Sequence, residues 1–218
     1  MTDSSPDIET ARALVSNSTL WPHVRAFLWD FAPFIHPSHL ADNRPVAVDA
    51  SPRLKRMALA ALGVEPCFHA FPADDASRLL LLDAETFGAL AKWLGAISNA
   101  DMLRRVTTGS AVRELKAALP GVYPDVFTYT AYFSRFKSDA KAEGTVSASS
   151  VVADGYAQLA SLLAPLPAQL LLRLRLRLPA DAPMPEAAGA ADKAPAPLEK
   201  VLLVLKLRFP EAYTLCSS

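Results

Sequence analysis

The sequence predicts a mainly α-helical, compact single domain of several helices. Apolar residues recur at helical spacing over most of the chain, and capping residues precede several of these segments. Strand-like alternation is confined to one stretch, so we expect at most a small β element near residues 170–178. The expected organisation is a helical domain over residues 1–179, a flexible Pro/Ala-rich linker over 180–197, and a C-terminal helix within 198–218 that packs back on the domain.

Composition narrows the class of protein. The 218 residues include 22 Lys+Arg and 22 Asp+Glu, so the formal net charge is zero, which argues against a nucleic-acid partner. Two cysteines are too few for a disulfide framework and fit a reducing compartment. The polar, acidic N-terminus is not a signal peptide, and no apolar run approaches the roughly 20 residues of a membrane span. We expect a cytoplasmic protein, monomeric when isolated, with no direct membrane span.

The N-terminal part combines a periodic helix with a proline-containing loop. Phe31–Leu40, which holds two prolines, is expected to be an ordered loop. It follows a helix whose apolar face comprises Leu20, Val24, Phe27, Leu28 and Phe31.

The clearest helix is expected over Ser51–Gly63. Ser51 can cap its start, Pro52 suits the first turn, and Gly63 suits the left-handed position after its end. Leu54 and Met57 belong to its expected inner face.

Three basic residues, Arg53, Lys55 and Arg56, stand in the first turn of that helix, where the helix dipole disfavours cations. They form either an ordinary solvated surface or a docking patch for an acidic partner.

Further helices are expected in the middle of the chain. Asp83 can cap a helix that carries an apolar stripe, Ala111–Leu119 forms another, and Ser147 or Ser149 opens a third. Tyr123–Phe136 is rich in aromatic residues; we interpret them as core rather than as a base-stacking platform, because no basic stripe accompanies them.

Gln169–Pro179, QLLLRLRLRLP, is the one strand-like stretch. On an extended strand its leucines would share one face, and Arg173, Arg175 and Arg177 would form a row on the other, about 7 Å apart. Such a row suits the carboxylates of a partner or anionic lipid headgroups. It equally suits an edge strand that charges protect from edge-to-edge aggregation, and the two roles are compatible.

The C-terminal part is less regular. Residues 180–197 are rich in Pro and Ala and cannot bury enough apolar area to offset the entropy of ordering. Leu198–Phe209 could be strand or helix by periodicity, and its Leu, Lys and Glu content favours helix.

Catalytic and metal-binding patterns are weak. His36, His39, Cys67 and His69 could supply zinc ligands, but their spacings match no established zinc pattern. No GxSxG, GxxxxGK[ST], GxGxxG or HExxH motif occurs. We therefore expect no enzyme, no cofactor and no metal, with His36 as a histidine that holds its loop through a backbone hydrogen bond.

Three stretches together carry a resemblance to a known family. Phe31–Leu40, FAPFIHPSHL, resembles the N-terminal F-x-P-x-x-(aromatic/aliphatic)-H-P-x-x-L segment of the YscK/PscK-type (SctK) proteins of bacterial type III secretion systems. Leu174–Pro179, LRLRLP, and Lys206–Glu211, KLRFPE, resemble that family's C-terminal half. The chain departs from the pattern at Ala41, where a proline often follows the leucine, and in its Pro/Ala-rich linker.

The resemblance implies a non-enzymatic adaptor of the cytoplasmic sorting platform of the injectisome. Such a subunit links the cytoplasmic domain of the inner-membrane ring protein to the pod protein and the export ATPase complex, and lies at the inner-membrane base of the apparatus. The loop would be either a docking surface or an element that fixes the fold. Candidate partner-binding residues are Arg173, Arg175, Arg177, Arg53, Lys55, Arg56, Phe31, Pro33, His36 and Pro37.

Two alternatives accompany this interpretation. One is a cytosolic chaperone or regulator of secreted cargo, although such chaperones are usually smaller and acidic. The other is a small metal-dependent enzyme that would use the four potential zinc ligands above.

Overall fold

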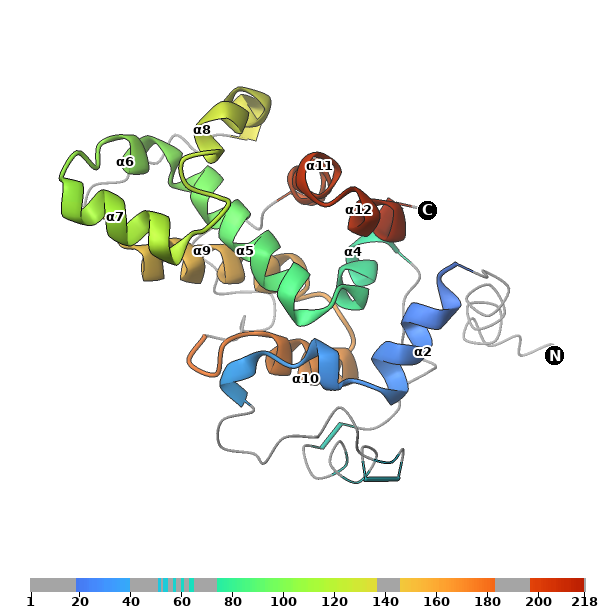
Figure 1. Cartoon of the computed structure of the whole chain (residues 1–218). Coiled ribbons are helices and arrows are strands. Elements are labelled where there is room, and N and C mark those ends of the chain that lie inside the picture. The colour runs from blue at the N-terminus through green and yellow to red at the C-terminus, as the bar shows by residue number, and fades with distance from the viewer. Residues whose placement is uncertain are drawn as a thin grey trace.

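The computed structural model describes residues 19–39, 74–136, 146–182 and 197–217, together with positions 51, 53, 54, 57, 60, 63 and 64. These residues are mainly helical, and no strand occurs among them, so the expected mainly α fold is confirmed (Figure 1). The elements are α2 (Trp21–Trp29), η1 (Ala32–Phe34), η2 (Pro37–His39), α4 (Asp75–Arg78), η4 (Leu79–Leu81), α5 (Ala84–Ser98), α6 (Ala100–Arg104), α7 (Gly109–Ala118), α8 (Val126–Tyr129), η5 (Thr130–Phe136), α9 (Ala148–Leu162), α10 (Ala168–Arg177), α11 (Leu198–Arg208) and α12 (Pro210–Ser217).

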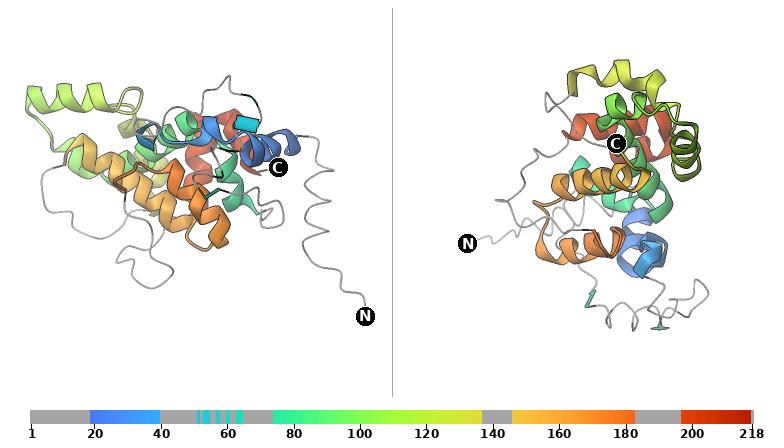
Figure 2. Two further views of the ribbon diagram at one scale, coloured as in Figure 1. Left: turned by 90° about the horizontal axis from the view of Figure 1, so that it is seen from below. Right: turned by 90° about the vertical axis from the view of Figure 1, so that its left-hand side faces the viewer.

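Helices α5 and α9 form the centre of the molecule, as the views in Figure 2 show. Both start as the sequence predicts. The Asp83 carboxylate accepts a hydrogen bond from the Thr86 amide at 2.7 Å, and Ser147 forms a capping box with Ser150.

Two glycines let these helices touch backbone to backbone. A Cβ placed on Gly95 would overlap the Val151 carbonyl oxygen, and one on Gly155 would overlap the Ala91 carbonyl oxygen. The close crossing explains why glycine, a poor helix former, stands inside both helices. The crossing fixes the distance between the two central helices.

The C-terminal helices cover the other side of α5. Helix α11 packs on α5 through Val201, Val204 and Leu205, and α12 packs on α4. Cys216 of α12 is fully buried, which raises the pKa of its thiol to about 12. The expectation of a helix at Leu198–Phe209 is confirmed.

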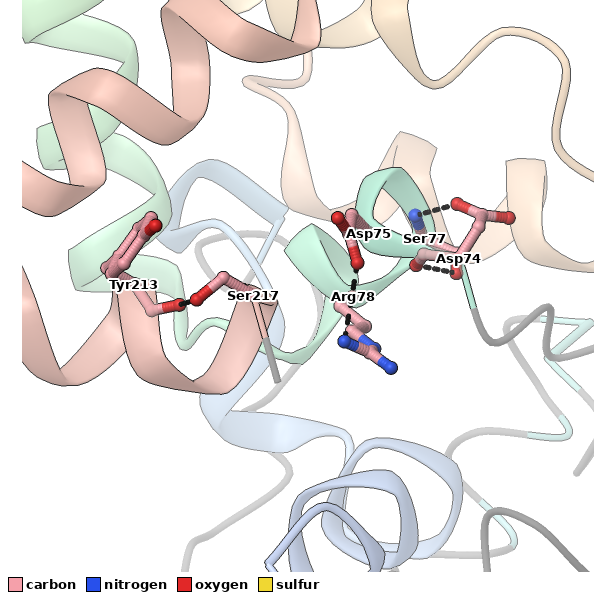
Figure 3. Close-up of polar contacts among 6 residues, drawn as sticks. All are labelled: Asp74, Asp75, Ser77, Arg78, Tyr213 and Ser217. Carbon is pink, nitrogen blue, oxygen red and sulfur yellow. Dashed lines mark hydrogen bonds and ion pairs between the residues drawn. The ribbon is translucent and has the colours of Figure 1, made fainter.

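Local polar contacts support α4 and α12 individually (Figure 3). The Asp74 carboxylate accepts a hydrogen bond from the Ser77 amide at 2.8 Å, and Arg78 pairs with Asp75 at 3.3 Å. On α12 the Ser217 hydroxyl donates to the Tyr213 carbonyl at 2.8 Å. None of the described helices is both long and apolar enough to cross a bilayer.

The prediction of a small β element near residues 170–178 is wrong, because this stretch forms helix α10. Leucine and arginine are both good helix formers, and none of the described segments offers α10 a neighbouring strand to pair with. The strand prediction from the Leu/Arg alternation failed because it required every arginine to face water.

Part of the expected helix over residues 51–63 can be checked. The Ser51 hydroxyl accepts a hydrogen bond from the Leu54 amide at 3.4 Å, and Gly63 has a φ of +71°, as its predicted position requires. The prediction that Leu54 and Met57 face inward is wrong, because their side chains are 57% and 59% exposed. Most of the expected linker, residues 183–196, lies outside the described residues.

Gly155→Ala tests the helix crossing. Alanine improves helix propensity by about 1 kcal/mol, but its methyl group would overlap the Ala91 carbonyl, so we expect a net loss of about 2 kcal/mol or more of unfolding free energy. Gly109→Ala, where a Cβ meets no atom within 4 Å, is the matched control and should not destabilise. Equal stability of the two variants in urea denaturation would contradict the close crossing.

Candidate functional site: a buried arginine junction and a neighbouring groove

Arg173 joins α10 to α2 from inside the protein. Its side chain is fully buried, with Nη1 donating to the Phe27 carbonyl at 2.6 Å and Nη2 to the Leu28 carbonyl at 3.3 Å. These carbonyls lie in the last turn of α2, where a helix has no partners of its own for them. The guanidinium also lies 5.2 Å from the ring centre of Phe27 and 4.9 Å from that of Phe31.

Arg177 repeats this arrangement one turn further along α10. Its Nη1 donates to the Leu80 carbonyl at 2.8 Å and its Nη2 to the Leu82 carbonyl at 2.6 Å, at the end of η4. Its guanidinium lies 5.5 Å from the ring centre of Phe34 and 4.4 Å from that of Phe87. We call Arg173, Arg177 and the four rings Phe27, Phe31, Phe34 and Phe87 the arginine junction.

The junction carries buried positive charge, and among the described residues no carboxylate forms an ion pair with Arg177. Burial lowers the pKa of Arg177 to about 9, while the more distant charge of Asp83 and then Tyr156 act in the opposite direction. The side chain is therefore still protonated at neutral pH. Backbone carbonyls and aromatic faces supply the compensation that water would otherwise give.

The loop after α2 closes over the end of α10. The His36 amide donates to the Leu176 carbonyl at 2.8 Å, and His39 Nε2 donates to the Leu178 carbonyl at 2.9 Å. The Ser38 hydroxyl accepts from the Ala180 amide at 2.9 Å. The two segments thus cap each other: Arg173 of α10 binds the end of α2, and the loop after α2 binds the end of α10. Figure 1 shows α2 and α10.

His36 holds this loop in a way the sequence indicated only in part. Its backbone amide makes the bond to α10, while its ring Nδ1 lies 2.8 Å from the Ser38 hydroxyl and its ring packs edge-on against Tyr156 at 5.7 Å between centres. Burial, and then the charge of His39, lower the pKa of His36, while the charge of Asp181 acts in the opposite direction.

The interpretation of Arg173, Arg175 and Arg177 as one exposed row is wrong. On a helix, Arg173 and Arg177 are one turn apart and share the buried face, whereas Arg175 points to solvent. Phe31 is likewise buried in the junction.

The remaining candidate residues are distributed as follows. His36 is half-buried, and Lys55 and Arg56 lie outside the described residues. The exposed candidates are Arg53, Pro33, Pro37 and Arg175.

The sequence analysis missed Phe27 and Phe87 as partners of the arginines. The i, i+4 spacing of Arg173 and Arg177 was the available signal, because residues at that spacing share one face of a helix.

A second polar cluster surrounds Lys200, the third residue of α11. Its Nζ donates to the Ser98 hydroxyl at 2.7 Å and to Gln158 Oε1 at 3.0 Å, and its side chain is only 5% exposed. Burial lowers its pKa to about 8.

A serine beside such a lysine could in principle act as a nucleophile beside its base. However, Ser98 is the last residue of α5, where the helix dipole disfavours the negative charge that a nucleophile develops. We interpret the Lys200 cluster as a buried polar contact between α11, α5 and α9.

A groove of about 540 Å³ lies beside the junction, between α7, α9 and the chain that leaves α10. Its apolar lining includes five alanines, and its polar lining includes Glu114, Asp181 and Tyr156. We call it the α7–α9 groove. Burial raises the pKa of Tyr156, and the nearby charge of Arg177 opposes that shift.

No three His, Cys, Asp or Glu side chains come together as a metal site within the described part of the chain. Cys67 and His69, two of the four potential zinc ligands, lie outside it. Comparison of the chain with protein-family models, with curated proteins and with solved structures gives no match.

Arg177→Met tests the junction. Methionine keeps much of the apolar stem but leaves the Leu80 and Leu82 carbonyls without donors, so we expect a loss of about 2–4 kcal/mol of unfolding free energy. Arg175→Met, on the exposed face of the same helix, is the control and should change stability by less than about 0.5 kcal/mol. Similar denaturation midpoints for both variants would refute the structural role of Arg177.

Lys200→Met tests the cost of the buried ammonium. The pKa drop from 10.5 to about 8 corresponds to about 3 kcal/mol against the charged form, part of which its hydrogen bonds offset. We expect the variant to be about 1–2 kcal/mol more stable at pH 7. Between about pH 8 and 10.5 the unfolded lysine binds a proton that the folded one does not, so the parent should gain stability and the difference should shrink. A difference that is independent of pH would contradict the lowered pKa.

Proposed function

We propose that this chain is a non-enzymatic adaptor of the cytoplasmic sorting platform of a bacterial type III secretion system. It would link the cytoplasmic domain of the inner-membrane ring protein to the pod and ATPase complex. The observation that carries the proposal is where the resembling stretches lie. Phe31–Leu40 and Leu174–Pro179 are far apart in sequence, yet His39 and Leu178, separated by 139 positions, share a hydrogen bond.

The third resembling stretch, Lys206–Glu211, also lies at an interface between elements. Arg208 stands 4.5 Å from the ring centre of Trp93 and 5.2 Å from that of Tyr129. All three stretches therefore hold helices together. Stretches of this kind would maintain a common fold while the exposed faces vary with the partner, which suits an adaptor better than an enzyme.

The junction supports one of the two roles considered for the Phe31–Leu40 loop. Phe31 and Phe34 are buried against the arginines, and His36 and His39 bind the end of α10. This favours a loop that fixes the fold, with Pro33 and Pro37 as its exposed part. Under the proposal, partners contact other exposed surfaces as well.

Co-purification tests the proposed function. The full chain, tagged and shown by circular dichroism to be folded, should retain the ring protein's cytoplasmic domain and the pod protein from lysates of cells that express them. A folded chain that retains neither protein would refute the adaptor role.

The adaptor role also predicts a genomic neighbourhood. Genes for the ring protein, the pod protein and the export ATPase should lie next to the gene for this chain.

Charge reversal at exposed candidate residues tests which surface is used. Arg53→Glu and Arg175→Glu should weaken retention of an acidic partner without lowering the melting temperature, since both side chains are exposed. Lys92→Glu, at a half-buried lysine outside the candidate set, is the matched charge control. Unchanged retention in both arginine variants would remove these residues from the partner-binding surface.

A further inference from the structure

The α7–α9 groove has the surface chemistry of a binding site. Its lining is mostly small and apolar, with alanines from α7 and α9 beside Val152, Leu178 and Pro179. A volume of about 540 Å³ falls within the range of roughly 300–1,000 Å³ that ligand sites occupy. Small side chains along helices let another backbone approach closely.

Both charged side chains that line the groove are acidic. Glu114 of α7 and Asp181, which follows α10, are both exposed, and no lysine or arginine is among the lining residues. Neither carboxylate forms an ion pair with another described residue, although the charge of Asp181 acts on the pKa of His36. The groove therefore offers acceptors for cations beside an apolar surface.

One wall of the groove adjoins the arginine junction. Leu178 and Pro179 follow Arg177 directly, and the ring of Tyr156 packs against His36. The mutual capping of α2 and α10 holds this wall in place. A wall fixed in advance lowers the ordering cost of binding.

We propose that the α7–α9 groove binds a basic segment of a partner protein that carries small apolar side chains next to lysine or arginine. The apolar side chains would cover the alanines, and the cations would pair with Glu114 and Asp181. Anionic lipids and acidic segments fit the groove less well, because the same carboxylates repel them. This inference rests on the proposed adaptor function, since it names a surface that a partner would contact.

Peptide binding to the full chain tests the groove. The probe is a fluorescein-labelled helical peptide with alanine and leucine on one face and lysines beside it, and the control peptide has glutamate in place of lysine. Fluorescence anisotropy should detect binding of the lysine peptide alone, and this binding should weaken as salt screens the charges.

Variants locate the binding. Glu114→Lys combined with Asp181→Lys should weaken binding of the lysine peptide about tenfold or more, because two attractions become repulsions. Ala153→Leu should also weaken binding of the lysine peptide by filling the groove, since Ala153 is an exposed lining residue. Glu211→Lys makes one charge reversal of the same kind on α12, outside the groove lining, and should leave binding unchanged.

Three results would overturn the inference: no binding of the lysine peptide, binding that the groove variants do not alter, or self-association that these variants abolish. The last result would assign the groove to a second copy of the chain. A chain that binds the lysine peptide through the groove but retains neither ring nor pod protein would refute the adaptor role alone. A chain that retains both proteins equally in parent and groove-variant forms would refute the groove as their contact.

Discussion

Two buried guanidinium groups determine how the N-terminal segment joins the rest of this protein. Arg173 and Arg177 replace the missing helical partners of carbonyls at the ends of α2 and η4. A buried charge is costly, so each group must be surrounded by acceptors and aromatic faces. Because these partners come from residues about a hundred or more positions away, the junction assembles only when the whole domain folds.

The junction also explains why the loop after α2 has its composition. Phe31 and Phe34 cover the guanidiniums, while His36, Ser38 and His39 bind the chain as it leaves α10. The central α5–α9 crossing, fixed by glycines, provides the framework on which the junction forms. The α7–α9 groove lies where these two parts of the structure meet.

Local signals in the sequence predicted the helix starts well and the burial of the arginines poorly. Asp83 and Ser147 start their helices as expected, because capping depends on residues only three positions away. The strand expected at 170–178 failed because Leu/Arg alternation distinguishes strand from helix only if arginine faces water. Whether Arg173 does so depends on carbonyls 146 positions away, which no local pattern reveals. The groove could not be predicted either, since only the fold brings Glu114 and Asp181 to the same groove.

Hydrogen exchange measured by mass spectrometry on Arg173→Met and Arg175→Met tests this account most directly. If the junction holds the N-terminal segment, peptides from residues 19–39 should lose protection in Arg173→Met while peptides from α5 and α9 keep it, and Arg175→Met should match the parent. Unchanged protection of residues 19–39 in Arg173→Met would contradict the central role of the buried arginines.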